Sequence, residues 1–207
     1  MKSNLTEIVF ILDRSGSMCD LVNDTIGGFN TFIENQKKEE GEAILTTVLF
    51  DNRYELLHDG VNIKDVNPLT NKEYFVRGST ALLDAIGKTI NSVGNRLNNT
   101  SEEDKPSKII FIITTDGEEN SSREFTQPKI KEMIKHQEDK YNWKFMFLGA
   151  NIDAVSTAQS LGIGGQCAAN YTANSRGTEA LYATMSKSIS CLRSVGSLDA
   201  NWKDDLK

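Results

Sequence analysis

Residues 8–12 form a continuous apolar run, Ile-Val-Phe-Ile-Leu, and Asp13 follows it at once. A strand with one solvated face alternates apolar and polar residues, whereas a strand buried on both faces is apolar throughout. Residues 109–113 form a second run of this kind. Such strands belong to parallel sheets that are covered by helices on both sides. The two runs therefore predict an α/β fold.

Segments with helical periodicity alternate with these apolar runs. The clearest has Leu83, Ile86, Ile90, Val93 and Leu97 on one helix face. We predict strands over 8–12, 43–50, 109–113, 145–148 and 166–171, and helices around 26–33, 80–97, 130–134, 152–161 and 181–195. This alternation favours a three-layer, Rossmann-like, doubly wound sheet that is mostly parallel.

Asp51 and Asn52 follow the apolar stretch 43–50 and predict a tight turn. The partial alternation over 53–58 then indicates a hairpin that adds one antiparallel edge strand. We find neither an internal repeat nor a linker. We expect a single domain over 1–198 and a polar C-terminal tail over 199–207 that frays.

Composition excludes several classes of function. The formal net charge is -6, with acids and bases interspersed, so the sequence lacks the basic footprint of a nucleic-acid binder. An acidic surface also disfavours anionic membranes, and no apolar stretch approaches the roughly 20 residues of a membrane helix. Three cysteines without metal spacing indicate reduced thiols. With no signal peptide visible, we expect a cytoplasmic location. Oligomeric state is left open.

Three loops at the predicted carboxyl edge of the sheet carry oxygen ligands. The first strand leads into Asp13, Ser15 and Ser17, the loop before the long helix ends at Thr80, and the central strand ends at Asp116. In doubly wound sheets, ligands bind at this edge. Two carboxylates and three hydroxyls suit a hard cation, namely Mg²⁺, Mn²⁺ or Ca²⁺, rather than zinc, which favours Cys and His.

These residues resemble the metal-ion-dependent adhesion site of von Willebrand factor type A domains. The Asp-x-Ser-x-Ser run, the Thr before a later helix and the Asp closing the central strand occur in the family's order, and the resemblance covers nearly the whole chain. It implies that Ser15 and Ser17 coordinate the metal directly and that Thr80 does so in one conformation. It also implies that Asp13 and Asp116 bind directly or through water.

The family resemblance also implies a function. The last coordination position of the metal is usually filled by a carboxylate from a partner, which predicts a protein-binding module of the adhesion or scaffold type rather than an enzyme. The partner would present an acidic residue. Some family members have a second metal site formed by adjacent acids, but here Asp20 is followed by Leu21, so a second site is not expected.

Two other classes of α/β protein share features with this sequence. A Mg²⁺-dependent phosphohydrolase of the haloacid dehalogenase type would also have an Asp after the first strand, but it needs a second Asp where this chain has Ser15. A nucleotide-binding Rossmann domain needs a glycine-rich turn there, and only Gly16 is present. Thr80 could act as a helix N-cap as well as a ligand. Asp84 could be an outer acceptor or simply solvated. Cys19 is expected to be buried.

Overall fold

The computed structural model describes residues 1–206 and contains one six-stranded sheet in the order β3-β2-β1-β4-β5-β6. All neighbouring strands are parallel except β2 and β3. The antiparallel edge strand and the mostly parallel sheet are therefore both confirmed. The strands are β1 (Lys2–Asp13), β2 (Glu42–Phe50), β3 (Tyr54–Asn62), β4 (Pro106–Thr115), β5 (Lys144–Gly149) and β6 (Ala168–Asn170).

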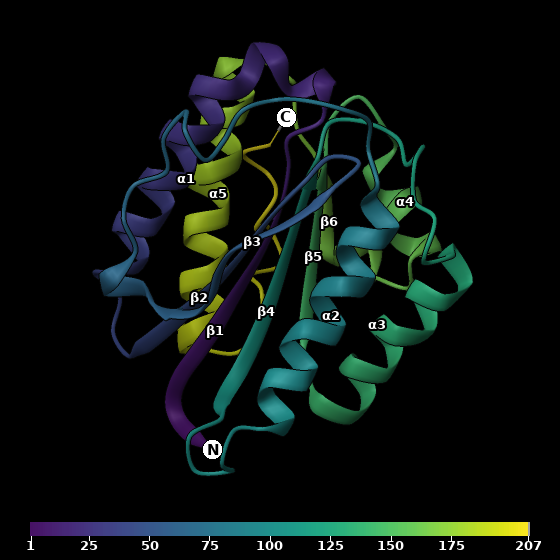
Figure 1. Cartoon of the computed structure of the whole chain (residues 1–207). Helices are drawn as coiled ribbons and strands as arrows, with labels where there is room; N and C mark the ends of the chain where they lie inside the picture. The colour runs from purple at the N-terminus through teal and green to yellow at the C-terminus, as the bar shows by residue number, and fades with distance from the viewer. Residues whose placement is uncertain (207) are drawn as a thin grey trace.

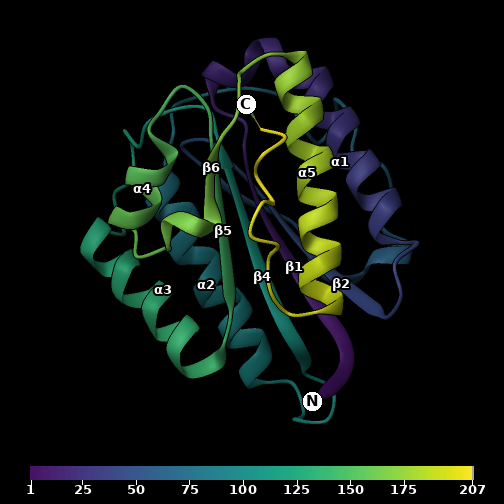
Figure 2. The ribbon, with the colours of Figure 1, turned by 180° about the vertical axis from the view of Figure 1, so that it is seen from behind.

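Helices cover both faces of the sheet, giving the predicted three layers (Figure 1). One face carries α1 (Val22–Gln36) and α5 (Ser175–Ser194), which pack side by side. In the view from behind, α5 lies in front of α1 on the same side of the sheet (Figure 2). The opposite face carries α2 (Leu82–Asn98), α3 (Gln127–Tyr141) and α4 (Ala154–Ser160), and three short 3₁₀ turns complete the fold: η1 (Gly16–Leu21), η2 (Ile63–Asp65) and η3 (Gly165–Cys167).

The apolar run of β1 is buried on both sides because alternate residues enter different cores. Phe10 faces α1 and α5 and packs edge-on against Phe29, with ring centroids 5.5 Å apart. Val9 and Ile11 face α2, α3 and α4 and belong to the second core. Since neither side meets water, both sets of positions must be apolar. This explains why the run lacks the alternation of a half-exposed strand.

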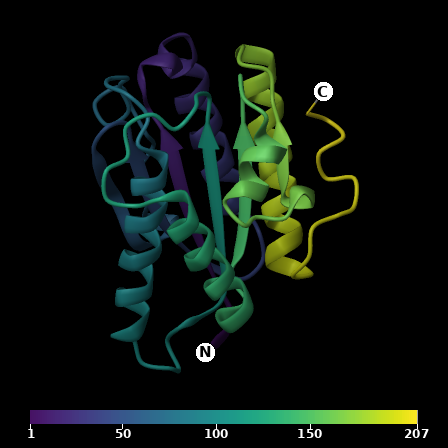
Figure 3. The same ribbon diagram turned by 90° about the vertical axis from the view of Figure 1, so that its right-hand side faces the viewer.

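The strand order reverses between β1 and β4, which are neighbours in the middle of the sheet. The chain leaves β1 toward α1 on one face and leaves β4 toward α3 on the other (Figure 3). The loops that follow these two strands therefore diverge at the carboxyl edge of the sheet. Ligands bind at such a reversal in doubly wound folds. Four of the five predicted ligands lie at the ends of these two strands or just after them, and the fifth, Thr80, lies in the segment before α2.

The C-terminal tail packs onto the domain, so the expectation that it frays is wrong. Trp202 Nε1 donates to Gln166 O at 2.8 Å, and Lys203 Nζ donates to Ala168 O at 3.0 Å. Leu206 is buried against the α1–α5 core. The tail fills space beside the short edge strand β6, a contact that its polar sequence did not indicate. None of the helices between residues 1 and 206 is long and apolar enough to cross a membrane.

Candidate metal centre

Three loops meet at the carboxyl edge of the sheet. We call residues 13–17 the Asp13 loop, residues 73–80 the Thr80 segment and residues 114–117 the Asp116 loop. The Asp13 loop follows β1, and the Asp116 loop includes the end of β4. Gly16 N donates to Gly78 O at 3.1 Å, which joins the Asp13 loop to the Thr80 segment. Residues far apart in sequence are thus brought to one place.

Both carboxylate oxygens of Asp13 are fixed by hydrogen bonds. Ser15 N donates to Oδ1 at 2.7 Å, and Thr115 Oγ1 donates to Oδ2 at 2.6 Å. Asp13 is completely buried. The Thr115 hydroxyl therefore orients Asp13 from the neighbouring strand.

A chain of hydroxyls joins the Asp13 loop to the Asp116 loop. Ser15 Oγ and Ser17 Oγ lie 3.1 Å apart, and Ser17 Oγ donates to Asp116 Oδ1 at 2.5 Å. Ser15 and Asp116 are buried, whereas Ser17 is exposed. The oxygen atoms therefore extend from the interior of the site to its open side.

Thr80 joins the site through its side chain and is not a helix cap. The N-cap of α2 is Ala81, and the Thr80 hydroxyl makes no hydrogen bond within residues 1–206. Thr80 is nevertheless buried. A methyl group added at Gly117 would lie 3.4 Å from Ser17 Oγ and 3.6 Å from Thr80 Oγ1. Both hydroxyls therefore flank the same glycine.

The two carboxylates of the site, Asp13 and Asp116, are both desolvated. Burial raises the pKa of Asp13 from its ordinary 3.8 to about 6, against the opposing hydrogen bonds from Thr115 and Ser15. Burial also raises the pKa of Asp116, which the hydrogen bond from Ser17 opposes. Neither carboxylate forms an ion pair within the described part of the chain. The site thus concentrates desolvated negative charge that a cation would neutralise.

The residues present fit a hard divalent cation. Between residues 1 and 206 no group of three or more His, Cys, Asp or Glu side chains is placed to hold a metal, so the centre relies on two carboxylates and on hydroxyls. Such an all-oxygen set matches the preference of Mg²⁺, Mn²⁺ or Ca²⁺. The structure brings together four of the predicted ligands, Asp13, Ser15, Ser17 and Asp116, by direct contacts. Thr80 joins them beside Gly117.

Asp84 is a buried hydrogen-bond acceptor rather than a solvated side chain, and Glu119 and Asn120 have structural tasks that the sequence did not indicate. The Asp84 carboxylate accepts the backbone N–H groups of residues 123–125, each at 2.9 Å. Burial alone would raise the pKa of Asp84, but these hydrogen bonds hold it below its ordinary value. Glu119 Oε2 accepts from Leu83 N at 2.9 Å, and Asn120 Oδ1 accepts from Thr80 N at 2.9 Å. These contacts fasten the loop after β4 to the start of α2.

The residues that follow the Asp13 loop include Cys19 and Asp20. Cys19 is exposed, so the expectation of burial is wrong. The reason is that η1 turns its Met18 side chain inward and leaves its neighbour outside. Asp20 is also exposed and has no resolved contact with a second acid within the described residues.

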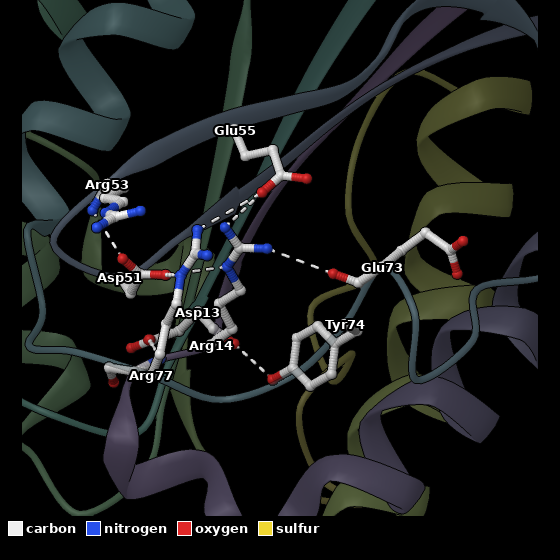
Figure 4. A network of polar contacts seen from close by, with 9 residues as sticks. Asp13, Arg14, Asp51, Arg53, Glu55, Glu73, Tyr74 and Arg77 are labelled. Carbon is white, nitrogen blue, oxygen red and sulfur yellow. Dashed lines mark hydrogen bonds and ion pairs between the residues drawn. The ribbon is translucent and has the colours of Figure 1, made fainter.

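The Asp13 loop also contains a fully buried Arg14, whose environment the sequence did not indicate (Figure 4). Its Nε donates to Asp51 Oδ2 at 3.0 Å, and its Nη2 donates to Glu55 Oε2 at 2.6 Å. Arg77 Nε donates to the same Asp51 oxygen at 2.7 Å.

No protein-family model and no curated protein matches the sequence. Solved structures match the fold. The von Willebrand factor domain of the type V pili tip protein Mfa5 from Porphyromonas gingivalis aligns with a TM-score of 0.64 and 11% identity, covering 96% of this chain and 99% of that chain. The pilus adhesin SpaC from Lactobacillus rhamnosus GG aligns with a TM-score of 0.66 and 13% identity, over 92% of this chain and 30% of that one.

A third similar structure is proximal thread matrix protein 1 from the mussel byssus, described with a zinc-occupied metal-ion-dependent adhesion site. It aligns with a TM-score of 0.63 and 15% identity, over 91% of this chain and 46% of that chain. This chain therefore spans less than half of the length of that protein. At such identities the likeness shows the fold alone. The chain has the fold of a von Willebrand factor type A domain, as the sequence predicted.

Proposed function

We propose that this chain is a divalent-metal-dependent protein-binding module that captures a carboxylate of its partner. The cation would be held by Asp13, Ser15, Ser17, Thr80 and Asp116. When bound, it would supply the positive charge to which an acidic side chain of a partner protein is attracted. The chain's own residues orient the ligands and keep the inner side of the site dry.

The observation that carries this proposal is the continuous contact from Ser15 through Ser17 to Asp116, beside a Thr80 hydroxyl that makes no hydrogen bond within residues 1–206. Two carboxylates only balance a divalent charge, and the three hydroxyls are neutral donors of electron density. A cation in this set therefore favours an anionic ligand at any remaining position. Because Ser17 is exposed, such a ligand can approach from solvent.

The fold supports this function by analogy. Similar structures include a byssus matrix protein and two pilus proteins, one of them an adhesin. One of them holds zinc at its adhesion site, although the donor set of our chain favours harder ions. Zinc therefore belongs in the binding tests beside Mg²⁺, Mn²⁺ and Ca²⁺.

Long-range electrostatics make the cation necessary to the proposal. The net charge of -6 mildly repels an acidic partner, with screening over about 8 Å at physiological salt. A local divalent charge would reverse this repulsion at the site. Binding of the partner should therefore require the metal ion.

We also propose that the chain is not an enzyme. The phosphohydrolase alternative gains no support, because Ser15 stands where a second Asp is needed. Both oxygens of Asp13 are engaged by donors from Ser15 and Thr115. A cytoplasmic location likewise remains a proposal, which cell fractionation with an antibody to the chain would test.

The deciding experiment first measures Mn²⁺ binding by electron paramagnetic resonance and then captures partners in Mg²⁺ or in EDTA. Thr80→Ala should weaken Mn²⁺ and partner binding while lowering stability by less than about 1 kcal/mol, because its hydroxyl caps nothing. Ser79→Ala, beside it but outside the ligand set, is the matched control. Equal partner binding in Mg²⁺, in EDTA and by Thr80→Ala would refute capture at this site.

A further inference from the structure

Arg14 occupies an unusual place in the Asp13 loop. It lies between Asp13 and Ser15, and its side chain is fully buried. A guanidinium group stays charged, so burial is costly unless its donors are paired. The pairing is extensive and joins three parts of the chain (Figure 4).

The guanidinium binds a different segment through each nitrogen. Nε donates to Asp51 in the hairpin turn at 3.0 Å, and Nη2 donates to Glu55 on β3 at 2.6 Å. Nη1 donates to Glu73 O, in the Thr80 segment, at 3.3 Å. The planar fork fixes all three directions at once, which a lysine ammonium does not do.

The Thr80 segment adds further contacts to the same network. Arg77 donates to Asp51, and the ring of Phe75 lies 5.4 Å from the Arg14 guanidinium and 5.1 Å from that of Arg77. Tyr74 Oη donates to Asp13 O at 2.6 Å. The segment that carries Thr80 is thus bound to the loop that carries Asp13.

Stability alone does not account for such a network. A buried ion pair is weak evidence for stabilisation, because apolar residues of similar volume often replace one without loss. Directional bonds instead select one relative arrangement of the segments that they join. Here those segments carry predicted metal ligands on both sides, namely Asp13 and Ser15 on one and Thr80 on the other.

We propose that Arg14 is a positioning residue, which sets the relative placement of the Asp13 loop and the Thr80 segment and thereby the affinity of the metal site. This inference rests on the proposed metal-binding function. The metal ligands would do the binding, while the Arg14 fork, held by Asp51 and Glu55, would hold them in register. The charge alone is not sufficient, so a lysine should not replace Arg14.

The test compares Mn²⁺ affinity, measured by electron paramagnetic resonance titration, with stability measured by urea unfolding in EDTA. Arg14→Lys keeps the charge and removes the fork, and we expect its Mn²⁺ dissociation constant to rise at least tenfold. A purely structural role would lower stability but leave the affinity of the folded protein unchanged. Affinity within twofold of the wild type would overturn the proposal.

A second variant serves if Arg14→Lys does not fold. Glu55→Gln weakens one arm of the fork from a side chain that is 45% exposed, and we expect a threefold or greater loss of Mn²⁺ affinity. Asp59→Asn is the matched control, because Asp59 lies on the same strand, is 46% exposed and pairs with Arg96, remote from the Asp13 loop. Equal effects of the two substitutions would contradict positioning through Arg14.

Failure of this inference is distinct from failure of the proposed function. If the wild-type chain does not bind Mn²⁺, the metal site itself is refuted and the inference falls with it. If the wild type binds Mn²⁺ and the folded Arg14→Lys and Glu55→Gln variants bind it equally well, only the positioning role is refuted.

Discussion

Asp13→Asn should stabilise the metal-free protein while greatly reducing its stabilisation by metal. Burial raises the pKa of Asp13 from 3.8 to about 6, a shift of about two pH units. Ionising Asp13 at neutral pH therefore lowers the free energy of unfolding by the equivalent of this shift. At about 1.4 kcal/mol per unit this is roughly 3 kcal/mol. An asparagine is neutral and close in size, so it removes this cost.

Part of that gain is lost to hydrogen bonding. The amide oxygen can still accept from Ser15 N, but the amide nitrogen cannot accept from the Thr115 hydroxyl. Thr115 Oγ1 also lies 3.1 Å from Gly117 O, which offers it another acceptor. If the weakened hydrogen bond of Thr115 costs about 1 kcal/mol, the variant should be more stable than the wild type by about 2 kcal/mol in EDTA.

With metal bound, the wild type should become more stable than Asp13→Asn. A ligand at a hundredfold excess over its dissociation constant stabilises the wild type by about 2.7 kcal/mol. The variant, with one ligand charge removed, should gain much less. Urea unfolding of both proteins in EDTA and in excess Mg²⁺ measures this. Asp20→Asn, an exposed acid beside the site, is the control and should match the wild type in both conditions.

The pH dependence has a definite sign. Because the folded pKa of Asp13 is raised, the proton contributes stability that is full below about 3.8 and is lost as pH rises through about 6. The advantage of Asp13→Asn in EDTA should therefore shrink by about 1.4 kcal/mol between about pH 7 and about pH 5. An asparagine variant that is less stable than the wild type in EDTA, with an equal response to Mg²⁺, would refute this reasoning.

Three further predictions concern the loops around the site. Gly78→Ala should cost at least about 1–2 kcal/mol in urea unfolding, because Gly78 has φ +67° and an added methyl would lie 2.1 Å from Asn52 Oδ1. Gly94→Ala is its control: it lies within α2 with open space around it and should stabilise by about 0.5–1 kcal/mol. Asp84→Ala should cost about 2–4 kcal/mol by the same method, since it frees the backbone N–H groups of 123–125. Unchanged stability would show that this loop is held by other contacts. A phosphatase screen with Mg²⁺ should show no turnover above background, and genuine turnover would place the chain in the wrong class.

The sequence alone predicted the layers of the fold and placed the five candidate ligands at one edge of the sheet. The continuous run at residues 8–12 required burial on both faces, and the period of residues 83–97 required a helix with one apolar side. Both are local consequences of strand and helix geometry. The five candidate ligands were found because they follow predicted strands or precede a predicted helix, and parallel topology brings those points to one edge.

The limits of the strands were harder to predict where polar residues are buried. β1 begins at Lys2, well before the apolar run, and includes a completely buried Glu7. Glu7 Oε1 is paired with Arg96 and accepts from Thr46 Oγ1 at 2.7 Å. The local sequence suggests that the strand starts after Glu7, because a charged residue normally lies outside the core. The partners that allow Glu7 to be buried lie on other elements and cannot be seen locally.

The tertiary structure alone decided how the site is supported. Ser17 and Asp116 are separated by 99 positions, and Arg14 and Asp51 by 37, yet both pairs are in direct contact. Whether a charged side chain is buried depends on whether opposite charges and hydrogen-bond acceptors reach it from other segments. The sequence therefore determined which residues lie at the carboxyl edge, because strand geometry is local. Only the packed structure determined that Arg14 is buried beneath them, because the partners of Arg14 lie far away in the sequence.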